Sequence, residues 1–363
     1  MHHWIATADA LGGFAERLAA APAVGLDTEF MRVHTYWPEL ALLQACVDGE
    51  IWLVDPQACG PLHALAPLLA RADGTKILHS ASEDVVALAP VARDGIEGLF
   101  DTQIAAAFAG LGPGIGYQRL VADLVGVALE KSETRSNWLA RPLSAQQLRY
   151  AEADVIHLAA LHVQLDQRLA ARGMLQWCRE DCAQLARGAV PPANPHWDFK
   201  TLWKWSPDQQ TRLRRLLDWR ERTAQRIDRP RLWLFDNPAA VELVDRPPAT
   251  QAELGARLAG QKGFPKRELA SLWDLLGAPL QDADFAGFTP IPAPLRDEAE
   301  RRFEALRARV ATRAAALDLP AALLAPRRVL ELLARGLPAP EAAGWRAALL
   351  AEDLAALDLP PPA

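Results

Sequence analysis

Cysteine is scarce in this sequence: there are four, at positions 46, 59, 178 and 182, and none of them forms a CxxC pair. Cysteines so few and so scattered exclude a disulfide framework and a Cys₄ zinc site. Long apolar runs are also lacking, since a stretch such as 85–92 contains a proline and is far shorter than the ~18 residues that a membrane span needs. The first residues lack the basic and apolar segments of a secretory signal. We therefore expect a cytoplasmic protein with no membrane partner, in which Cys178 and Cys182 are buried, reduced thiols.

The chain instead has the composition of a globular protein. It is 363 residues long, 50% hydrophobic and 23% charged, with a mean hydropathy of −0.03, which excludes wholesale disorder and predicts two or three domains. Residues 1–190 carry 22 acidic and 14 basic side chains, whereas residues 191–363 carry 23 and 25. Residues 200–231 alone hold ten basic and four acidic side chains. Such a segment is typical either of a surface that binds a polyanion or of a solvated helix face.

Short apolar segments in the first half predict strands at 23–27, 40–47, 51–54 and 76–79. Farther along, Ser144 and Gln147 form a capping box, which predicts the start of a long helix. Apolar positions then recur at spacings of three and four and mark the buried face of that helix: Ala151, Val155, Leu158, His162, Leu165 and Leu169. The mixture predicts an α/β domain over residues 1–190, and the prolines that follow it predict a linker.

The residues beyond this linker are helical in pattern and hold a weak internal repeat. Segments 228–230 and 241–243 are echoed by 318–320 and 330–332, at offsets of 90 and 89 residues. A proline-rich connector at 288–294 separates the two copies. We expect two similar all-α helical bundles after the α/β domain, although an echo of this size also arises by chance in a background rich in Ala and Leu.

Four carboxylates stand where a catalytic site is expected. Asp27 and Glu29 are two residues apart at the end of a predicted strand. If the extended backbone continues through Glu29, both side chains project from one face, where they repel each other unless a cation lies between them. Asp84 lies at the start of a helix, and Asp154 lies on another helix, one turn beyond Tyr150. Each residue alone is typical of a turn, a cap or a solvated surface. Their order along the chain is the informative feature.

These residues fall in the segments Leu26–Phe30, Leu78–Asp84 and Tyr150–Asp154, which resemble the three motifs of the ribonuclease D family, in the DEDD exonuclease superfamily. Three further stretches resemble this family as well: 35–40, 100–103 and 131–143. A tyrosine four residues before the last aspartate, in place of a histidine five residues before it, is typical of the tyrosine branch of the superfamily. His157 is then expected to be an ordinary helix residue.

The resemblance spans nearly the whole chain and implies its architecture. Residues 1–190 are expected to form a ribonuclease H-like mixed sheet with helices. Residues 208–280 and 295–357 are expected to form two HRDC domains, which are small helical bundles. The second copy lacks the glycine hairpin that 262–264 represents in the first. We therefore expect a packing role for the second copy.

The same resemblance implies a 3′→5′ exoribonuclease that trims RNA 3′ ends, with tRNA precursors as the substrate class, nucleoside 5′-monophosphates as products and no obligatory protein partner. Two divalent ions supply this chemistry, and hard carboxylate oxygens select Mg²⁺ or Mn²⁺. The four negative charges of the acids balance two such ions. In the family pattern Asp27 bridges both ions, Glu29 and Asp154 complete one shell, and Asp84 reaches the other through water. Tyr150 then orients the attacking water.

Candidate substrate-binding residues are Phe30, His79, Lys131, Arg135 and Arg141. Phe30 and His79 are close to the acids in sequence and suit an unstacked terminal base. Core packing for Phe30 and a satisfied strand-end histidine are the competing interpretations. The three cations suit phosphate groups, but each is also compatible with a solvated surface. A DNA-directed 3′→5′ exonuclease with the same site and a catalytically silent nucleic-acid-binding protein are the alternative functions.

Overall fold

The computed structural model describes residues 2–129, 136–188 and 194–361. Contacts within the chain divide it into two units. The first comprises Met1–Met31, Leu40–Ala189 and Leu295–Ala363, and the second comprises Arg32–Glu39 and Val190–Pro294. The C-terminal helices thus group with the sheet domain by contact, and a short loop of the sheet domain groups with the helices of the second unit. The sequence did not predict either grouping.

A six-stranded mixed sheet forms the centre of the first unit, in the order β1-β4-β3-β2-β5-β6. The strands are β1 (His2–Ile5), β2 (Ala23–Met31), β3 (Glu39–Val47), β4 (Glu50–Val54), β5 (Thr75–Leu78) and β6 (Leu99–Asp101). Strand β2 pairs in parallel with β5, and β3 pairs antiparallel with β4. The four predicted strands are confirmed. Strands β1 and β6 were not predicted, because both are very short and neither shows a clear alternation.

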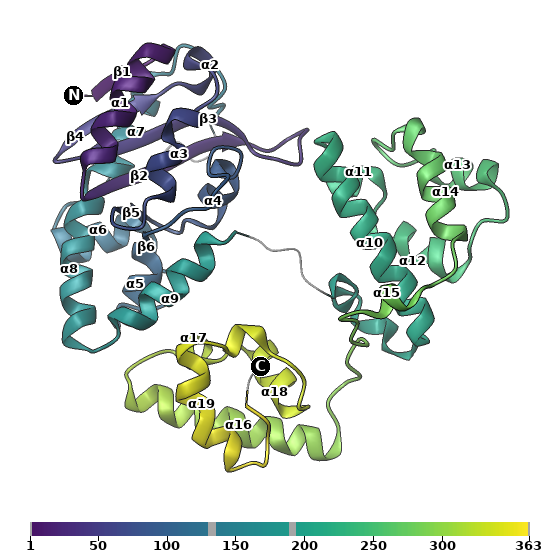
Figure 1. The fold of residues 1–363 in the computed structure, drawn as a ribbon. Coiled ribbons are helices and arrows are strands. Elements are labelled where there is room, and N and C mark those ends of the chain that lie inside the picture. Colours follow the sequence, from purple (N-terminus) through teal and green to yellow (C-terminus); the bar gives the residue numbers. More distant parts are fainter. Residues whose placement is uncertain (1, 130–135, 189–193, 362–363) are drawn as a thin grey trace. The chain divides into compact units, whose positions relative to one another are not determined.

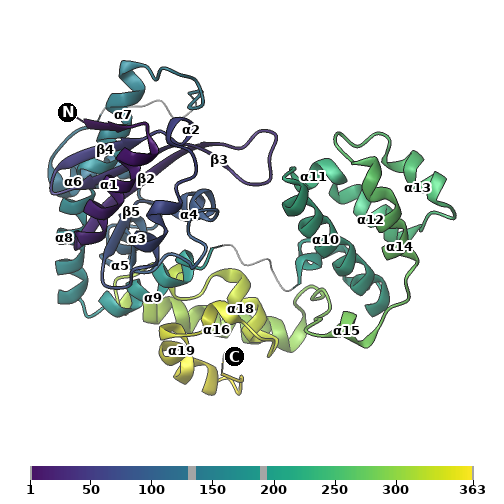
Figure 2. The same cartoon turned by 45° about the horizontal axis from the view of Figure 1, so that its top comes forward.

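Helices lie on both sides of this sheet (Figures 1 and 2). Those before the end of the sheet domain are α1 (Ala8–Ala20), α2 (Pro56–Cys59), η1 (His63–Leu65), α3 (Ala66–Ala70), α4 (Ser82–Leu88), α5 (Thr102–Phe108), α6 (Tyr117–Val125), α7 (Ala145–Ile156), α8 (Leu158–Ala171) and α9 (Leu175–Ala186). One hydrophobic core joins Val24 and Leu26 of β2 to side chains of α1, α3 and α4. Gly25 faces the other layer, where an added Cβ would lie 3.1 Å from Cβ of Leu158. Alternation along β2 therefore assigns odd-numbered residues to the layer of α7 and α8 and even-numbered residues to the layer of α4.

The capping box at Ser144 and Gln147 is present, as the sequence predicted. The prediction of a single long helix was wrong, however, because α7 ends at Ile156 and α8 begins at Leu158. His157 separates them with φ −98° and ψ −6° and is therefore a junction residue. The apolar spacing runs through this break because Val155 and Leu158 are both buried in the same layer. Cys178 and Cys182 on α9 are buried free thiols, as expected.

The C-terminal part of the first unit contains α16 (Asp297–Ala316), α17 (Ala321–Leu324), α18 (Arg327–Ala334), η5 (Pro340–Ala342) and α19 (Trp345–Ala355). The start of α19 is bound to α9. The guanidinium of Arg346 donates to both carboxylate oxygens of Asp181 at 2.6 and 2.7 Å. The indole of Trp345 stacks on Trp177 with ring centroids 4.7 Å apart. These contacts explain why the C-terminal helices group with the sheet domain.

The second unit is helical, as the sequence predicted. Its elements are η2 (Pro195–Asp198), η3 (Lys200–Lys204), α10 (Pro207–Ile227), α11 (Arg231–Leu234), α12 (Asn237–Asp245), α13 (Gln251–Leu258), η4 (Lys266–Glu268), α14 (Leu269–Gly277) and α15 (Asp282–Phe285). Leu213, Leu217 and Phe235 lie in its core. The loop Arg32–Glu39 is attached at the end of α10, where the Asp228 carboxylate accepts from the backbone N–H of Tyr36 at 2.9 Å.

The internal repeat is present in the structure. A long helix, α10 or α16, is followed in each copy by an aspartate with positive φ, 51° at Asp228 and 52° at Asp318. A four-residue helix comes next, α11 or α17, and then a longer helix, α12 or α18. The copies diverge afterwards: the first continues with α13, η4 and α14, and the second continues with η5 and α19. The sequence echo therefore marks the three helices that the two copies share.

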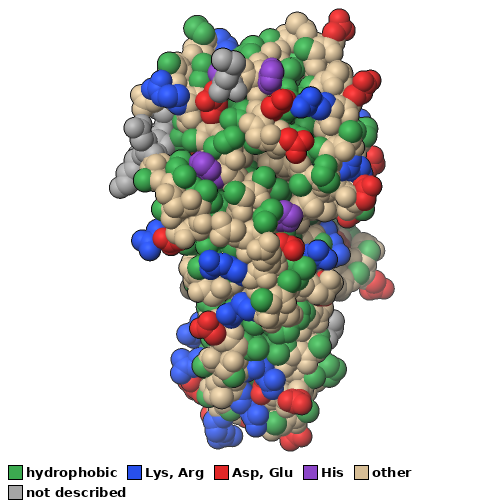
Figure 3. Space-filling model, turned by 90° about the vertical axis from the view of Figure 1, so that its left-hand side faces the viewer, with side chains coloured by type: hydrophobic (Ala, Val, Ile, Leu, Met, Phe, Trp, Pro, Cys, Tyr) green, Lys and Arg blue, Asp and Glu red, His purple; other side chains and the backbone are tan. Residues whose placement is uncertain are grey.

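None of the helices within the described ranges combines the length and the apolar character that a membrane crossing requires. On the face drawn in Figure 3, acidic and basic side chains are interspersed with hydrophobic ones.

Candidate active site

Three carboxylates come together at the end of the sheet. Asp27 and Glu29 lie on β2, and Asp154 lies on α7, which contacts β2. One ligand atom from each of the three lies within 4.8 Å of the others. Asp27 and Glu29 share the odd-numbered face of β2, as the two-residue spacing predicted, and the structure shows that this face turns toward α7. The structure thus brings together residues that are more than 120 positions apart in sequence.

Burial and mutual repulsion raise the pKa of every carboxyl group in this cluster. For Asp27, burial and then the charges of Asp84, Asp154 and Glu29 raise the pKa well above its ordinary value. Burial, followed by the charges of Asp154 and Asp84, raises the pKa of Glu29 to about 8. Burial is also the first cause for Asp154, whose pKa rises to about 7. A cation among these oxygens would relieve the repulsion that raises the pKa values.

Asp84 approaches this cluster from the other layer of the domain. It lies in the first turn of α4 and is 7% exposed. Its Oδ1 accepts a hydrogen bond of 2.5 Å from the hydroxyl of Thr28 on β2. Burial raises the pKa of Asp84 to about 6, although the hydrogen bond from Thr28 acts in the opposite direction. Asp84 is outside the group of three whose ligand atoms lie within 4.8 Å, and its charge still raises the pKa of each of them.

Tyr150 precedes Asp154 by one turn of α7, which places its hydroxyl on the same side of the helix as the Asp154 carboxylate. Burial, followed by the negative charges of Asp154, Glu29 and Asp27, raises the pKa of the phenol above its ordinary value of 10.0. The phenol is therefore protonated at neutral pH. It is able to orient a water molecule by hydrogen bonding, but it is a poor proton acceptor.

The donor set suits a divalent cation. Oδ2 of Asp154 is buried and has no hydrogen-bond partner among the described residues, which is costly for a carboxylate oxygen unless a ligand satisfies it. Carboxylate oxygens are the ligands that hard cations such as Mg²⁺ prefer. Asp27, Glu29 and Asp154 therefore fit a divalent metal ion by ligand type, spacing and unsatisfied charge.

The candidate substrate residues have different surroundings. Phe30 is half-buried on β2, directly after Glu29. Nδ1 of His79 lies 2.9 Å from the hydroxyl of Thr102, while its Nε2 is buried with no hydrogen-bond partner in the described part of the chain. Burial lowers the pKa of His79, so this ring is neutral at pH 7. Lys131 and Arg135 lie outside the described residues.

Arg141 is engaged within the domain. Its Nε and Nη2 donate to the two oxygens of the Asp55 carboxylate at 2.7 and 2.8 Å. The remaining N–H groups donate to the carbonyl oxygens of Ala41, Trp138 and Ala140. An arginine has five N–H donors, and all five are used here. The expectation of a phosphate contact is therefore corrected: Arg141 holds the segment before α7 against the strands β3 and β4.

Three further side chains at the site were missed by sequence reasoning. Thr28 contacts Asp84, as described above. Tyr117 on α6 donates to the backbone carbonyl oxygen of Ala153 at 3.1 Å, and its ring lies 5.5 Å from that of His79. Trp138 is 2% exposed and packs against Tyr150 with ring centroids 5.9 Å apart. Only Thr28 carried a signal, since strand alternation places it opposite Asp27 and Glu29.

Known proteins resemble this chain over most of its length. Residues 2–170 match a family model described as a 3′-5′ exonuclease. Ribonuclease D of Xanthomonas oryzae pv. oryzae is 44% identical over 359 residues, which is 96% of each chain. Ribonuclease D of Pseudomonas paraeruginosa is 32% identical over 92% of this chain and 90% of the relative.

A solved structure extends the likeness to three dimensions. The crystal structure of Escherichia coli RNase D, an exoribonuclease involved in structured RNA processing, matches with a TM-score of 0.82 and 30% sequence identity, and the match covers 98% of both chains. It includes the sheet domain and the helices that follow it, which confirms the predicted fold class. Given this match and the near full-length identity to the Xanthomonas enzyme, the chain belongs to the ribonuclease D family of hydrolytic 3′→5′ exoribonucleases.

Proposed function

We propose that this exoribonuclease trims the 3′ ends of tRNA precursors and releases nucleoside 5′-monophosphates, by hydrolysis at two divalent metal ions held by Asp27, Glu29, Asp84 and Asp154. The observation that carries the proposal is the convergence of three carboxylates within 4.8 Å around a buried, unpartnered oxygen of Asp154. tRNA precursors are the substrate class that the family resemblance implies.

Charge balance supports two ions. Four carboxylates bring about four negative charges when ionised, and two divalent cations neutralise them. Asp27, Glu29 and Asp154 fit one ion by their spacing. Asp84 approaches from α4 with one oxygen already bonded to Thr28, which suits a contact through water. Such ions, when bound, make a water molecule nucleophilic at neutral pH and neutralise charge on the phosphoryl and leaving oxygens.

The chain's own residues orient the reactants. The protonated hydroxyl of Tyr150 orients the attacking water, because it lies one turn from Asp154 and stays neutral in this acidic surrounding. Phe30 and His79 remain our candidates for contact with the terminal nucleotide, since Phe30 adjoins Glu29 and His79 precedes the helix of Asp84. Lys131 and Arg135 are proposed to contact phosphates on the family pattern alone.

We further propose that 208–280 and 295–357 are HRDC modules and that the first contacts the RNA backbone. The basic helix α10 only partly supports this, because most of its arginines have partners inside the unit. Arg215 donates to the carbonyl oxygens of Leu275 and Ala278 at 2.8 Å each, and Arg226 forms an ion pair with Glu268 at 2.6 Å. These side chains stabilise the bundle.

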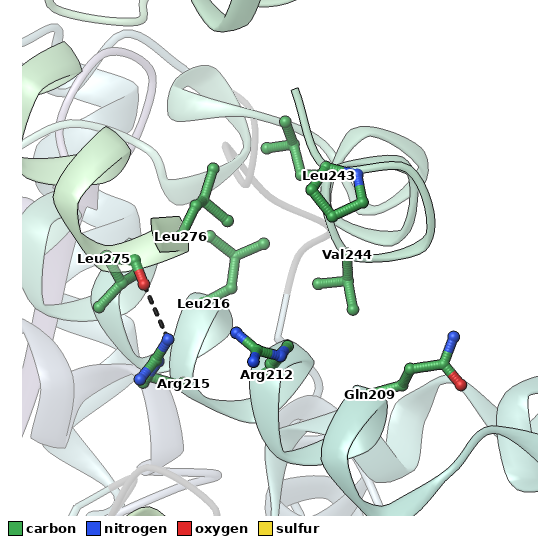
Figure 4. A pocket seen from close by; sticks show the side chains of 9 residues that line it. Gln209, Arg212, Arg215, Leu216, Leu243, Val244, Leu275 and Leu276 are labelled. Carbon is green, nitrogen blue, oxygen red and sulfur yellow. Dashed lines mark hydrogen bonds between the residues drawn. The ribbon is translucent and has the colours of Figure 1, made fainter. Parts of the chain in front are cut away.

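Arg212 is different, because no hydrogen bond or ion pair joins it to another described residue. It lies beside a pocket of about 160 Å³ whose other walls are Gln209, Arg215, Leu216, Leu243, Val244, Pro247, Leu275 and Leu276. Figure 4 shows Arg212 beside Leu216 with no dashed line to it, whereas the guanidinium of Arg215 is bonded to the carbonyl oxygen of Leu275. Arg212 is therefore our candidate for a phosphate contact in this module.

The test is the release of mononucleotides from a 3′-tailed tRNA and from a matched DNA strand, with Mg²⁺, Mn²⁺ or a chelator. We expect monophosphates from the RNA only when metal is present, and none from the variant Asp27→Asn. Asp94→Asn, an exposed aspartate on the same domain, is the matched control and should match the wild type.

Preference for the DNA strand would keep the site and change the proposed substrate. Equal rates on the tailed tRNA and on an unstructured RNA would remove tRNA precursors as the favoured class. Full activity of Asp27→Asn, or activity in chelator, would overturn the proposed metal site itself.

A further inference from the structure

The carboxylates of the proposed site come from two layers of the sheet domain. Asp27 and Glu29 share a face of β2 with Gly25, which packs against Leu158 of α8, and Asp154 meets them from α7. Asp84 lies on α4, whose residue Val85 belongs to the core with Leu26 on the opposite face of β2. The site therefore needs a device that holds Asp84 in register with the other three acids across the strand.

Thr28 is the strand residue that faces Asp84. It is 6% exposed and lies between Asp27 and Glu29 in sequence. Its hydroxyl donates to Oδ1 of Asp84 at 2.5 Å. Hydroxyl donors to carboxylates form short, strong hydrogen bonds. One residue of β2 therefore fixes the Asp84 carboxylate through its hydroxyl.

Asp101 fixes the helix that carries Asp84. This residue is 1% exposed at the end of β6. Its Oδ2 accepts from the N–H of Ala81, the N-cap residue of α4, at 2.8 Å. Its Oδ1 accepts from the N–H groups of Ser80 at 3.1 Å, Gln103 at 2.7 Å and Ile104 at 3.2 Å. The methyl side chain of Ala81 cannot cap α4 by hydrogen bonding, so the carboxylate of Asp101 anchors the start of that helix.

We infer that Thr28 and Asp101 are positioning residues of the exonuclease: Thr28 aims the Asp84 carboxylate, and Asp101 sets the origin of the helix that bears it. The inference rests on the proposed function, in which Asp84 serves a metal ion. Residues that orient a metal-binding carboxylate typically change metal affinity or activity by about 10–100-fold when they are replaced.

The first test compares Thr28→Val with Thr28→Ser. Valine keeps the shape of threonine but lacks the hydroxyl, whereas serine keeps the hydroxyl. For Thr28→Val we expect the Mg²⁺ concentration at half-maximal rate to rise about 10-fold or more and kcat to fall, while KM for RNA stays within about 2-fold. Thr28→Ser should recover most of the loss. Thr211→Val is the matched control, since Thr211 is a buried threonine of the second unit whose hydroxyl has no partner in the described residues.

The second test is Asp101→Asn, which removes one contact selectively. With its oxygen at the Oδ1 position, asparagine still accepts from Ser80, Gln103 and Ile104, while its amide N–H₂ meets the N–H of Ala81. We expect the same rise in the Mg²⁺ requirement as for Thr28→Val. A core variant of similar melting temperature, such as Leu65→Ala at a fully buried position, should keep the wild-type Mg²⁺ requirement.

Asp84→Asn, measured in parallel, separates this inference from the proposed function. If Asp84→Asn retains wild-type activity, the proposed metal site is wrong. If Asp84→Asn is inactive while Thr28→Val and Asp101→Asn keep the wild-type Mg²⁺ requirement and kcat, only the inference is overturned. A lower melting temperature with unchanged metal dependence would also overturn it, because it would make both residues purely structural. If Thr28→Val does not fold, Asp101→Asn and Thr28→Ser decide the question.

Discussion

Replacing Glu29 with glutamine is expected to stabilise the metal-free protein at neutral pH, although it removes a residue of the proposed catalytic site. Glutamine has nearly the shape of glutamate and does not ionise. In the wild type, burial and then the charges of Asp154 and Asp84 raise the pKa of Glu29 from 4.5 to about 8. Between pH 4.5 and about 8, Glu29 therefore binds its proton more tightly in the folded state than in the unfolded state.

The sign follows from this difference in proton binding. Because the folded state binds more protons than the unfolded state between pH 4.5 and about 8, the free energy of unfolding falls as the pH rises through this range. Each pH unit is worth about 1.4 kcal/mol. Ionisation of Glu29 in the unfolded state therefore lowers the free energy of unfolding of the wild type by about 3 kcal/mol at pH 7 and by less than about 1 kcal/mol at pH 5. The Glu29→Gln variant does not lose this stability, because glutamine does not ionise.

Thermal unfolding in EDTA across pH 5–8 measures the effect. For a unit of this size we expect the variant to melt about 6–12 °C above the wild type at pH 7, with a smaller gap at pH 5. Saturating Mg²⁺ should close the gap, because the cation stabilises only the wild-type carboxylate. Glu16→Gln, at an exposed position on α1, should follow the wild type. Equal or lower stability of Glu29→Gln at pH 7, or a gap independent of pH, would refute the crowding of charges described here.

Three more outcomes are expected. The Mg²⁺ concentration that half-saturates the enzyme should fall as the pH rises from 6 to 8. The reason is that the carboxyl groups of Asp154 and Glu29, with pKa values of about 7 and about 8, must lose protons to bind metal. Calorimetric titration would show this proton release, and a metal affinity independent of pH would contradict it. Arg141→Ala should lower the free energy of unfolding in urea by about 3 kcal/mol, because it removes the ion-pair partner of the buried Asp55. A loss of RNA affinity without a loss of stability would instead indicate that Arg141 contacts a phosphate. Arg212→Ala should reduce the salt dependence of RNA binding by about one counterion without altering stability, whereas Arg215→Ala should mainly lower stability; the reverse pattern would argue against Arg212 as the contact.

The sequence predicted the parts of the fold that follow from burial. Strands that are almost entirely apolar, such as 40–47 with Gln44 as its one polar residue, were found because a central strand is covered on both faces. The extension of β2 to Met31 was not predicted, because residues 28–31 are not an apolar run. The same limit applies to β6, whose three residues are too few to show a period.

Charge counting was less informative than the motifs. Ten basic residues between 200 and 231 suggest one binding surface, yet Arg215 and Arg226 are used by carbonyl oxygens or carboxylates inside the bundle. A sequence does not show which guanidinium will meet a helix C-terminus. Likewise, Arg141 looked like a phosphate ligand beside the third motif, and only the structure shows that Asp55 and three carbonyl groups use all its donors.

The site was predictable to the extent that its residues share one face of one element. Asp27 and Glu29 follow from a two-residue spacing, and Tyr150 with Asp154 from a four-residue spacing. Asp84 approaches the other acids from the opposite side of β2, and no spacing along the sequence indicates that it lies near them. Strand alternation nevertheless constrains that relation: if Asp27 and Glu29 face α7, the residue between them must face α4. Thr28 lies between the two acids, so its side chain reaches Asp84 from β2 while Asp27 and Glu29 keep facing α7. The Thr28 hydroxyl is therefore the group whose removal tests how Asp84 is positioned.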